Sequence, residues 1–413
     1  KLGDRERAKK AWREVLEIFA RDREALDALV RLCEADAEWR PLAEVLDRQA
    51  QIYADEDTER AAQTALRVAR LMEQRLGSSD KAAAVLWHVL DELDPVNREA
   101  HADLRRIERA RGNIEATIRV AEREYYMSND AEERVARMLE VGLLARDQLG
   151  DPRRALQAFE RVFADAPNHE HALSIAAQLY AEVGDWQRHS EALEQVAQNA
   201  PEGAPRRDVY LQIARTTDEK LGRAEDAFVW YRKAHEHAPD DSTLAALRDA
   251  AEAHELWREL AEVYEQERHR AAASSPADYA SACRELARLC EQRLGDRAQA
   301  LAVMRDAVAA TPTDKSLLDE AERLAEADNA ADAFRVLLTI YASVFESTSD
   351  SGERLIIHRK RAQIKEKRLA NAPAALDELL RAFALAPDDK SVQAEVLRLA
   401  EVTGPWQPFL RMQ

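Results

Sequence analysis

The sequence predicts an all-α solenoid of antiparallel helical hairpins, and three observations lead to that prediction. Glycine (11) and proline (13) are scarce among the 413 residues, while alanine, leucine, glutamate and arginine are abundant. No run of alternating β-branched residues indicates a strand. A leucine-glycine junction also recurs with a period close to 73 residues. Such composition is typical of a chain that is helical almost throughout, and such a period indicates a stack of similar repeats.

The recurring junction consists of a leucine, a glycine and a residue that can cap a helix. Glycine adopts the left-handed conformation that ends a helix, and Asp, Ser or Asn can cap the next one. Each copy is therefore expected to join two helices. The copies are spaced 74, 73, 72, 73 and 75 residues apart: Leu2-Gly3-Asp4, Leu76-Gly77-Ser78, Leu149-Gly150-Asp151, Leu221-Gly222-Arg223, Leu294-Gly295-Asp296 and Leu369-Ala370-Asn371.

Two further marks divide each repeat into four helices. Proline, which is poor inside a helix, follows five of the leucines by 18 or 19 residues, at Pro95, Pro167, Pro239, Pro312 and Pro387. Tryptophan precedes an apolar helix at Trp39, Trp186, Trp257 and Trp406, with Ile114 and approximately Ala330 in the other copies. We expect one continuous solenoid over 1–413, with repeats at approximately 1–57, 58–130, 131–204, 205–275, 276–349 and 350–413.

Within a repeat, small, bulky and proline residues keep constant spacings. The frame is Gly222, Ala227, Tyr231, Ala234, Pro239, then Gly150, Ala155, Phe159, Val162, Pro167, and again Gly295, Ala300, Met304, Ala307, Pro312. This frame resembles the second helix of the tetratricopeptide repeat (TPR), and Leu173 to Trp186 resembles its first helix and Gly-Asp-aromatic turn. The resemblance extends from Leu2 to Phe409 and is degenerate where no glycine precedes Trp39.

The resemblance implies a right-handed superhelix of roughly eleven hairpins whose first helices line a concave groove. Stability would come from the stacking of neighbouring hairpins, because one hairpin cannot bury its apolar face alone. The chain begins at Lys1 without methionine, and the pattern is interrupted at both ends. We therefore expect it to be a piece of a longer protein.

Charge and cysteine content narrow the functional classes. A net charge of −18 and a pI of about 5.2 disfavour nucleic acid and anionic membranes as partners, since a phosphate footprint needs surplus Lys and Arg. The apolar runs are too short to span a bilayer. Cys33, Cys283 and Cys290 are too few for a disulfide framework and are interpreted as buried apolar residues. A cytoplasmic location is preferred, with a periplasmic one left open.

No motif indicates catalysis, so we predict a protein that is not an enzyme and that needs neither a cofactor nor a metal. The chain contains no Gly-rich phosphate loop, His-Glu-x-x-His, Cys-x-x-Cys or Gly-x-Ser-x-Gly sequence. His169-Glu170-His171 and His235-Glu236-His237 suggest metal ligands, but residues two apart on a helix point roughly 200° apart. They are interpreted as surface histidines.

The function predicted is a protein–protein interaction scaffold or adaptor that binds partner peptides or helices along the groove. The alternatives are a structural component that assembles with copies of itself and a regulatory arm of an enzyme whose catalytic domain lies outside this sequence. The register places these side chains in the groove: Arg67, Arg137, Glu140, Gln178, Gln212, Glu285, Arg293, Lys360 and Lys367.

One segment interrupts the acidic surplus. Between Arg354 and Arg368 lie seven Lys or Arg residues, against Glu353 and Glu366. A solvated helix face is one interpretation of this segment. The other is a docking patch for an acidic segment of a partner or of a second copy.

The packing register can be tested by enlarging a small residue. Ala155, Ala227 and Ala300 share one frame position and are expected to be buried at helix crossings. Ala227→Leu should cost about 1–3 kcal/mol because added methylenes overpack a close crossing. Thermal unfolding followed by circular dichroism measures this effect, and an unchanged melting temperature would contradict the register.

Overall fold

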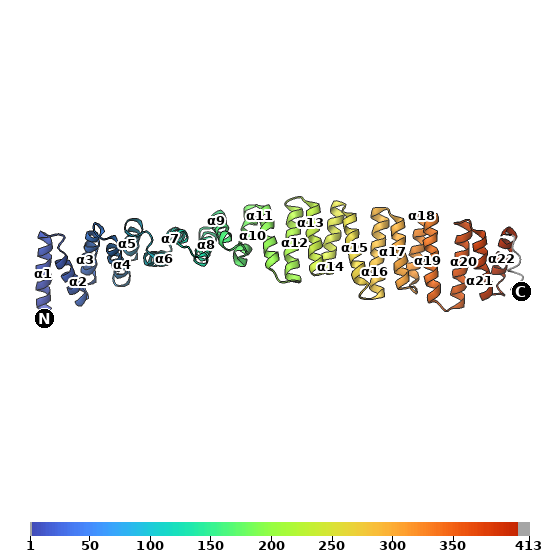
Figure 1. The fold of residues 1–413 in the computed structure, drawn as a ribbon, viewed down its shortest axis with the longest axis horizontal. Coiled ribbons are helices and arrows are strands. Elements are labelled where there is room, and N and C mark those ends of the chain that lie inside the picture. The colour runs from blue at the N-terminus through green and yellow to red at the C-terminus, as the bar shows by residue number, and fades with distance from the viewer. Residues whose placement is uncertain (1, 404–413) are drawn as a thin grey trace. The chain divides into compact units, whose positions relative to one another are not determined.

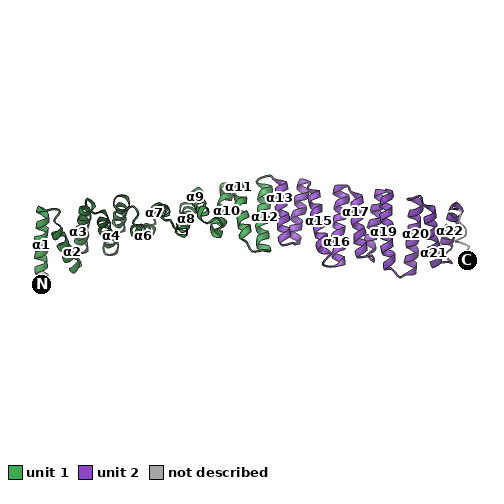
Figure 2. Cartoon of the chain, viewed as in Figure 1, with its two compact units in different colours: residues 1–222 green, residues 223–413 purple. Residues whose placement is uncertain are grey.

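The computed structural model of the protein describes residues 2–403, all of whose regular elements are helices. It divides into two compact units, residues 1–222 and 223–413 (Figure 2). The division falls at the Leu221-Gly222-Arg223 junction. The continuous solenoid over 1–413 stays a prediction.

The first unit contains twelve α-helices (Figure 1). They are α1 (Leu2–Ile18), α2 (Arg23–Ala35), α3 (Trp39–Ala54), α4 (Thr58–Gln74), α5 (Ser79–His88), α6 (Arg98–Ala110), α7 (Ile114–Met127), α8 (Ala131–Leu144), α9 (Pro152–Asp165), α10 (Glu170–Val183), α11 (Trp186–Asn199) and α12 (Ala204–Glu219). Two π-helical turns, η1 (Val89–Leu93) and η2 (Ala145–Leu149), extend α5 and α8.

The second unit contains the remaining helices of the described chain. They are α13 (Ala224–His237), α14 (Asp241–His254), α15 (Trp257–Ala271), α16 (Pro276–Leu289), α17 (Arg297–Ala310), α18 (Lys315–Asp328), α19 (Ala331–Ser347), α20 (Ser351–Lys367), α21 (Ala372–Leu385) and α22 (Lys390–Thr403), with η3 (Cys290–Leu294) extending α16. In both units each helix packs against the next in sequence. We call the even-numbered helices A helices and the odd-numbered ones B helices.

The leucine-glycine junctions end A helices as predicted. The backbone is left-handed at Gly77, Gly150, Gly222 and Gly295, with φ between 61° and 68°, and at Ala370, with φ 50°. At Gly77, Gly150, Gly295 and Ala370 the amide of the following residue then donates to the carbonyl six residues back, for example Asp151 to Ala145 at 2.9 Å. This geometry satisfies a carbonyl that the helix end leaves unpaired. The first copy is an exception, because α1 already begins at Leu2 and no turn forms at Gly3.

A second kind of left-handed turn follows the A helices that do not end at a leucine-glycine junction, and sequence analysis largely missed it. The left-handed residue lies two positions before the B helix in five hairpins: Ala37, Gly112, Gly184, Glu255 and Asn329, with φ between 54° and 79°. Only two of the five are glycine. Packing of the hairpin therefore imposes a backbone conformation that the local residue type does not favour.

Small side chains lie at the helix crossings, as expected. Ala155, Ala227 and Ala300 are fully buried or nearly so. Between α8 and α9, Gly142 allows the closest approach, since a Cβ there would lie 2.5 Å from the ring of Phe159. The short side chains let a bulky neighbour fill the gap between two backbones.

The helix-opening tryptophans pack between neighbouring hairpins, although their rings are half-buried. A cation from the next A helix lies over each ring: Arg75 over Trp39 at 4.9 Å, Lys220 over Trp186 at 5.4 Å and Arg293 over Trp257 at 4.4 Å. Arg368 over Phe334 at 4.9 Å is a fourth copy. Each cation directly precedes a junction leucine. In the remaining repeat Ile114 replaces the aromatic residue and Gln148 replaces the cation. Trp406 lies outside the described residues.

Ala370→Gly is expected to stabilise the second unit. The left-handed backbone at Ala370 costs an L-residue about 1–2 kcal/mol, which glycine avoids, although glycine loses more entropy on folding. The net gain should be about 0.5–1 kcal/mol, measured as a higher melting temperature. Ala245→Gly, at an exposed helical position of α14, should instead destabilise by about 1 kcal/mol. A fall in melting temperature for both variants would contradict the assigned strain.

Candidate partner-binding surface

All nine side chains predicted for the groove lie on A helices or their π-helical extension. Arg67 is on α4, Arg137 and Glu140 on α8, Gln178 on α10, Gln212 on α12, Glu285 on α16, Arg293 on η3, and Lys360 and Lys367 on α20. They are distributed over the two units and do not converge on one site. Their use by a partner stays a prediction.

Ion pairs between successive A helices engage many of these charges. In the first unit Arg67 pairs with Glu34, Arg70 with Asp103 at 2.9 Å, and Arg105 with Glu140 at 3.1 Å. In the second unit Arg323 pairs with Glu291 at 2.7 Å, Lys360 with Glu322 at 2.6 Å, and Arg398 with Glu366 at 2.6 Å. Partners lie about one hairpin apart in sequence, so the pairs link neighbouring hairpins on the A side.

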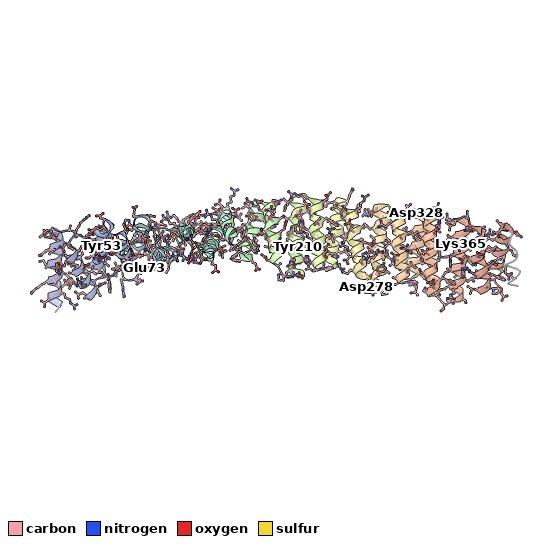
Figure 3. All side chains as sticks on the ribbon, viewed as in Figure 1. Tyr53, Glu73, Tyr210, Asp278, Asp328 and Lys365 are labelled. Atoms are coloured by element: carbon pink, nitrogen blue, oxygen red, sulfur yellow. The ribbon has the colours of Figure 1, made fainter. Side chains whose placement is uncertain are left out.

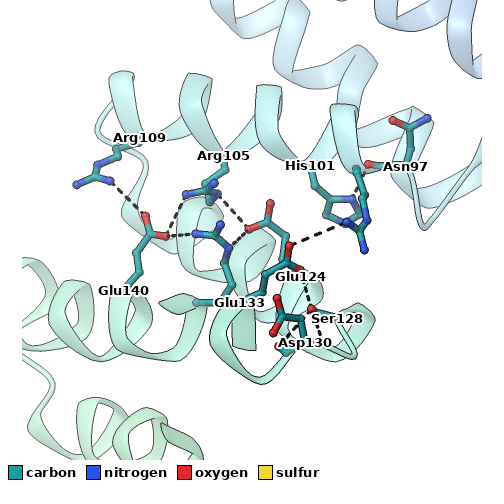
Figure 4. Close-up of polar contacts among 11 residues, drawn as sticks. Asn97, His101, Arg105, Arg109, Glu124, Ser128, Asp130, Glu133 and Glu140 are labelled. Carbon is teal, nitrogen blue, oxygen red and sulfur yellow. Dashed lines mark hydrogen bonds and ion pairs between the residues drawn. The ribbon is translucent and has the colours of Figure 1, made fainter. Parts of the chain in front are cut away.

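Glu140 is the centre of the pairs on α8 (Figure 4). Its carboxylate contacts Arg105 at 3.1 Å, Arg109 at 3.3 Å and Arg137 at 3.2 Å, and its side chain is only 15% exposed. Glu140 therefore links α8 to α6, and Arg137, a second predicted groove residue, links α8 to α7 through Glu124. By contrast, Gln178, Gln212 and Lys367 are exposed.

Lys360 is also engaged by a side chain of the protein itself. Its ammonium donates to Glu322 of α18 at 2.6 Å, and the same carboxylate oxygen accepts the hydroxyl of Tyr341 at 2.6 Å. Tyr341 is buried, and burial together with its hydrogen bond to Glu322 raises the pKa of its phenol. The phenol therefore stays a proton donor, and Lys360 completes a trio that joins α18, α19 and α20.

The basic segment of α20 encloses a buried carboxylate that sequence reasoning did not identify. Glu378 of α21 is 2% exposed and contacts His358 at 2.7 Å, Arg361 at 3.0 Å and Lys365 at 2.7 Å; Lys365 is labelled in Figure 3. Burial alone raises the pKa of this carboxyl, but the hydrogen bonds from Lys365 and His358 and the charge of Arg361 outweigh it and lower the pKa. Two of the seven Lys and Arg side chains of this segment, Arg361 and Lys365, therefore face inward beside His358.

A buried ammonium in the first unit has the opposite arrangement. The ammonium of Lys9 on α1 is inaccessible and contacts Glu6 at 2.8 Å, Asp36 at 2.7 Å and Glu38 at 2.9 Å. Burial lowers the pKa of Lys9, but its hydrogen bonds to Asp36, Glu6 and Glu38 outweigh burial and raise it. Neither Lys9 nor Glu378 differs from a surface residue in the sequence, since only packing shows which charges are enclosed.

Open grooves lie beside the A helices in both units. One, of about 510 Å³, lies between α20 and α22 and is lined by Ile356, Arg359, Lys360, Lys367, Glu395 and Arg398, among others. Another, of about 450 Å³, lies beside α6 and α8 and includes Val96, Arg98, His101, Met127 and Glu133. Their linings are mixed in charge, unlike the mostly apolar lining of a small-molecule pocket.

The histidine and cysteine interpretations have mixed outcomes. His169 caps α10 and His171 is exposed, but His235 is buried between Thr243 at 2.7 Å and Glu267 at 2.9 Å, so its interpretation as a surface residue is wrong. All three cysteines are buried and unpaired, as predicted, and burial raises the pKa of Cys290 to about 11.

The described residues contain neither a cluster of metal ligands nor a membrane-spanning helix. Over residues 2–403, no three His, Cys, Asp or Glu side chains are grouped to hold a metal ion. No helix in the same range has the length and apolarity needed to cross a membrane.

Glu378→Gln should destabilise the second unit at neutral pH. Removing the buried charge leaves Arg361 and Lys365 uncompensated, at a cost on the order of 3 kcal/mol, since these partners are partly solvated. Because the folded pKa lies below the ordinary 4.5, the stabilisation is complete above 4.5 and is lost as the pH falls through the folded pKa. The melting temperatures of the Glu378→Gln variant and of the unchanged chain should therefore converge as the pH is lowered from about 7 to about 3. A difference that stays constant over this range would contradict the ionised, paired state assigned to Glu378.

Comparisons with known proteins concern the fold. No family model matches the chain, and no curated protein matches it. Similar solved structures include YrrB, a TPR protein with an unusual peptide-binding site (16% identity; 50% of this chain and 96% of that chain; TM-score 0.28). Naa15/Naa10 bound to HypK-THB matches at 16% identity, over 95% of this chain and 66% of that chain, with a TM-score of 0.32.

A tetratricopeptide repeat protein from Parabacteroides merdae matches at 13% identity, over 82% of this chain and 98% of that chain, with a TM-score of 0.26. At these identities and TM-scores, no inference about function rests on the likenesses. The fold is evident from the chain's own helices, since consecutive antiparallel helices pack throughout both units and the small motif residues are buried at their crossings. Each unit is therefore a TPR-like all-α helical repeat solenoid.

Proposed function

We propose that the chain is a non-catalytic scaffold that binds segments of partner proteins along its A helices. The observation that supports this proposal is the local positive charge of the α20–α22 groove in a chain whose net charge is −18. Its lining contains four cations, Arg359, Lys360, Lys367 and Arg398, against the two carboxylates Glu366 and Glu395. A partner segment with acidic side chains fits this imbalance.

One ion pair within this groove is weak enough to exchange with a partner. Arg359 and Glu395 are 2.6 Å apart, but both side chains remain more than a third exposed. Exposed pairs of this kind contribute about 0–1 kcal/mol, so an acidic side chain of a partner can replace the internal carboxylate at little cost. Lys367 is exposed and makes no ion pair with any described residue.

The α20–α22 groove also offers an apolar contact to a partner. Ile356, on α20, is 56% exposed and lines the groove. The occupant is therefore a segment that combines acidic residues with at least one apolar side chain. An acidic segment of a second copy has the same chemistry, and analytical ultracentrifugation of the chain alone distinguishes this case by its concentration-dependent mass.

Lys367→Glu is expected to weaken binding of a fluorescein-labelled peptide of Glu and Leu residues by roughly fivefold, since one favourable charge contact becomes unfavourable. The salt dependence of binding, measured by fluorescence anisotropy, should decrease as well. Lys367 is a cleaner test than Lys360, whose reversal would place a second carboxylate beside Glu322.

Lys390→Glu provides the matched control. Lys390 is exposed at the start of α22 and does not line the groove. Because both variants replace a lysine by glutamate, they have the same net charge. Equal weakening by both variants would mean that only the overall charge matters, and it would contradict the groove assignment.

A further inference from the structure

Two residues of the first unit depart from the repeat pattern, and both line the groove of about 450 Å³ beside α6 and α8. One is polar at a core position, and the other is apolar at a surface position. Either departure alone would be unremarkable in a degenerate repeat. Their convergence on one groove suggests a binding site.

His101 occupies a position that is leucine in most comparable A helices. Four residues after the helix cap, four of the five other hairpins of this type have leucine, at Leu26, Leu173, Leu244 and Leu318, and the fifth has Gln393. The side chain of His101 is 1% exposed, and its Nδ1 lies 2.8 Å from the carbonyl oxygen of Asn97. A carbonyl can only accept, so Nδ1 donates and Nε2 carries the lone pair.

The Nε2 atom of His101 is buried and receives no hydrogen bond from any described residue. An acceptor enclosed in this way costs about 1–3 kcal/mol, a penalty that leucine at the same position would avoid. His101 is one of the residues that line the groove, and its unpaired Nε2 is the acceptor that a donor of a bound segment would satisfy. The position therefore favours binding over stability.

Val96 is the second departure. It directly precedes the helix cap Asn97, at a position where four of the five comparable hairpins have a polar residue, Arg21, Asn168, Thr313 or Asp388, and the fifth has Pro239. Its side chain is 66% exposed at the rim of the groove, and Met127 lies half-buried in the lining. Together they form a small apolar surface beside the unpaired acceptor.

The charges around this groove are mostly balanced. Arg105 and Arg137 both contact Glu124, at 3.1 and 2.9 Å (Figure 4). Arg98 reaches Glu133 only at 4.0 Å and is 82% exposed, while Glu133 accepts a hydrogen bond from Ser128 at 2.7 Å. Recognition here therefore depends on a hydrogen-bond donor and an apolar group, unlike the charged groove at α20–α22.

We propose that this groove binds a segment of a partner protein that places an apolar side chain on Val96 and Met127 and donates an N–H group to His101 Nε2. The inference rests on the scaffold function proposed above and assigns it a second, charge-independent site. A polypeptide fits better than a small molecule, because Val96 stands at the rim and a ligand confined to about 450 Å³ would leave it uncovered.

The experiment uses random 12-residue peptides displayed on phage and selected on the whole chain, with affinities then measured by fluorescence anisotropy. His101→Leu installs the residue that the repeat uses elsewhere, and Val96→Asn installs the polar residue found at Asn168. Each variant should weaken one class of selected peptides at least tenfold. Asn168→Val, the reciprocal change in another hairpin, should leave their affinities unchanged.

Two further measurements separate binding from folding. His101→Leu should melt at or above the temperature of the unchanged chain, so its lost affinity cannot be attributed to unfolding. In methyl NMR spectra the ε-methyl group of Met127 should shift on peptide addition, whereas that of Met304, buried in the second unit, should not.

The possible failures are distinguishable. If selected peptides bind the unchanged chain and both groove variants equally, or leave Met127 unperturbed, the inference about this groove is overturned while the scaffold function stands. Peptides weakened by Lys367→Glu but not by His101→Leu belong to the α20–α22 groove, and a selection that yields only such peptides would overturn the inference about this groove. If no peptide binds the chain, the scaffold function fails as well.

Discussion

The close approach of consecutive helices is the constraint on which the rest of the structure depends. A single hairpin leaves an apolar face exposed, and only the neighbouring hairpin can cover it. That contact requires small side chains at the crossings, as at Ala155 and Ala300, and even a glycine where Phe159 lies against α8. The same contact holds Ala37 and Glu255 in left-handed turns that their side chains disfavour. Stacking energy therefore overrides local preference at several turns.

Electrostatics is organised by the same stacking. Successive A helices lie close enough for Arg and Glu side chains to pair across hairpins, so much of the charge on this side is compensated within the chain. Two charges are enclosed with partners of opposite sign: Lys9 with three carboxylates, and Glu378 with Arg361 and Lys365. A buried ion is tolerated only with such compensation. The cations that remain available to a partner are fewer than the composition of α20 indicates.

The two proposed grooves illustrate how a repeat protein can acquire specificity. A repeated sequence supplies equivalent positions, and a departure at one position is informative because the other copies show what the fold alone requires. His101 departs from leucine and Val96 from polar residues, and neither departure improves packing or solvation. At α20–α22 the distinctive feature is instead a surplus of cations in an acidic chain. Different hairpins thus offer different chemistry on one kind of framework.

The sequence by itself determined the all-α repeat fold, the junctions after Leu76 and Leu149, and the buried alanines, because helix-ending glycines and small residues leave periodic marks that depend on local chemistry. It also placed all nine candidate groove residues on A helices. It could not show that Lys360 is bound to Glu322, that the cations of α20 enclose Glu378, or that His101 lacks a donor. Those facts depend on which side chains of separate helices meet, and only tertiary packing decides that.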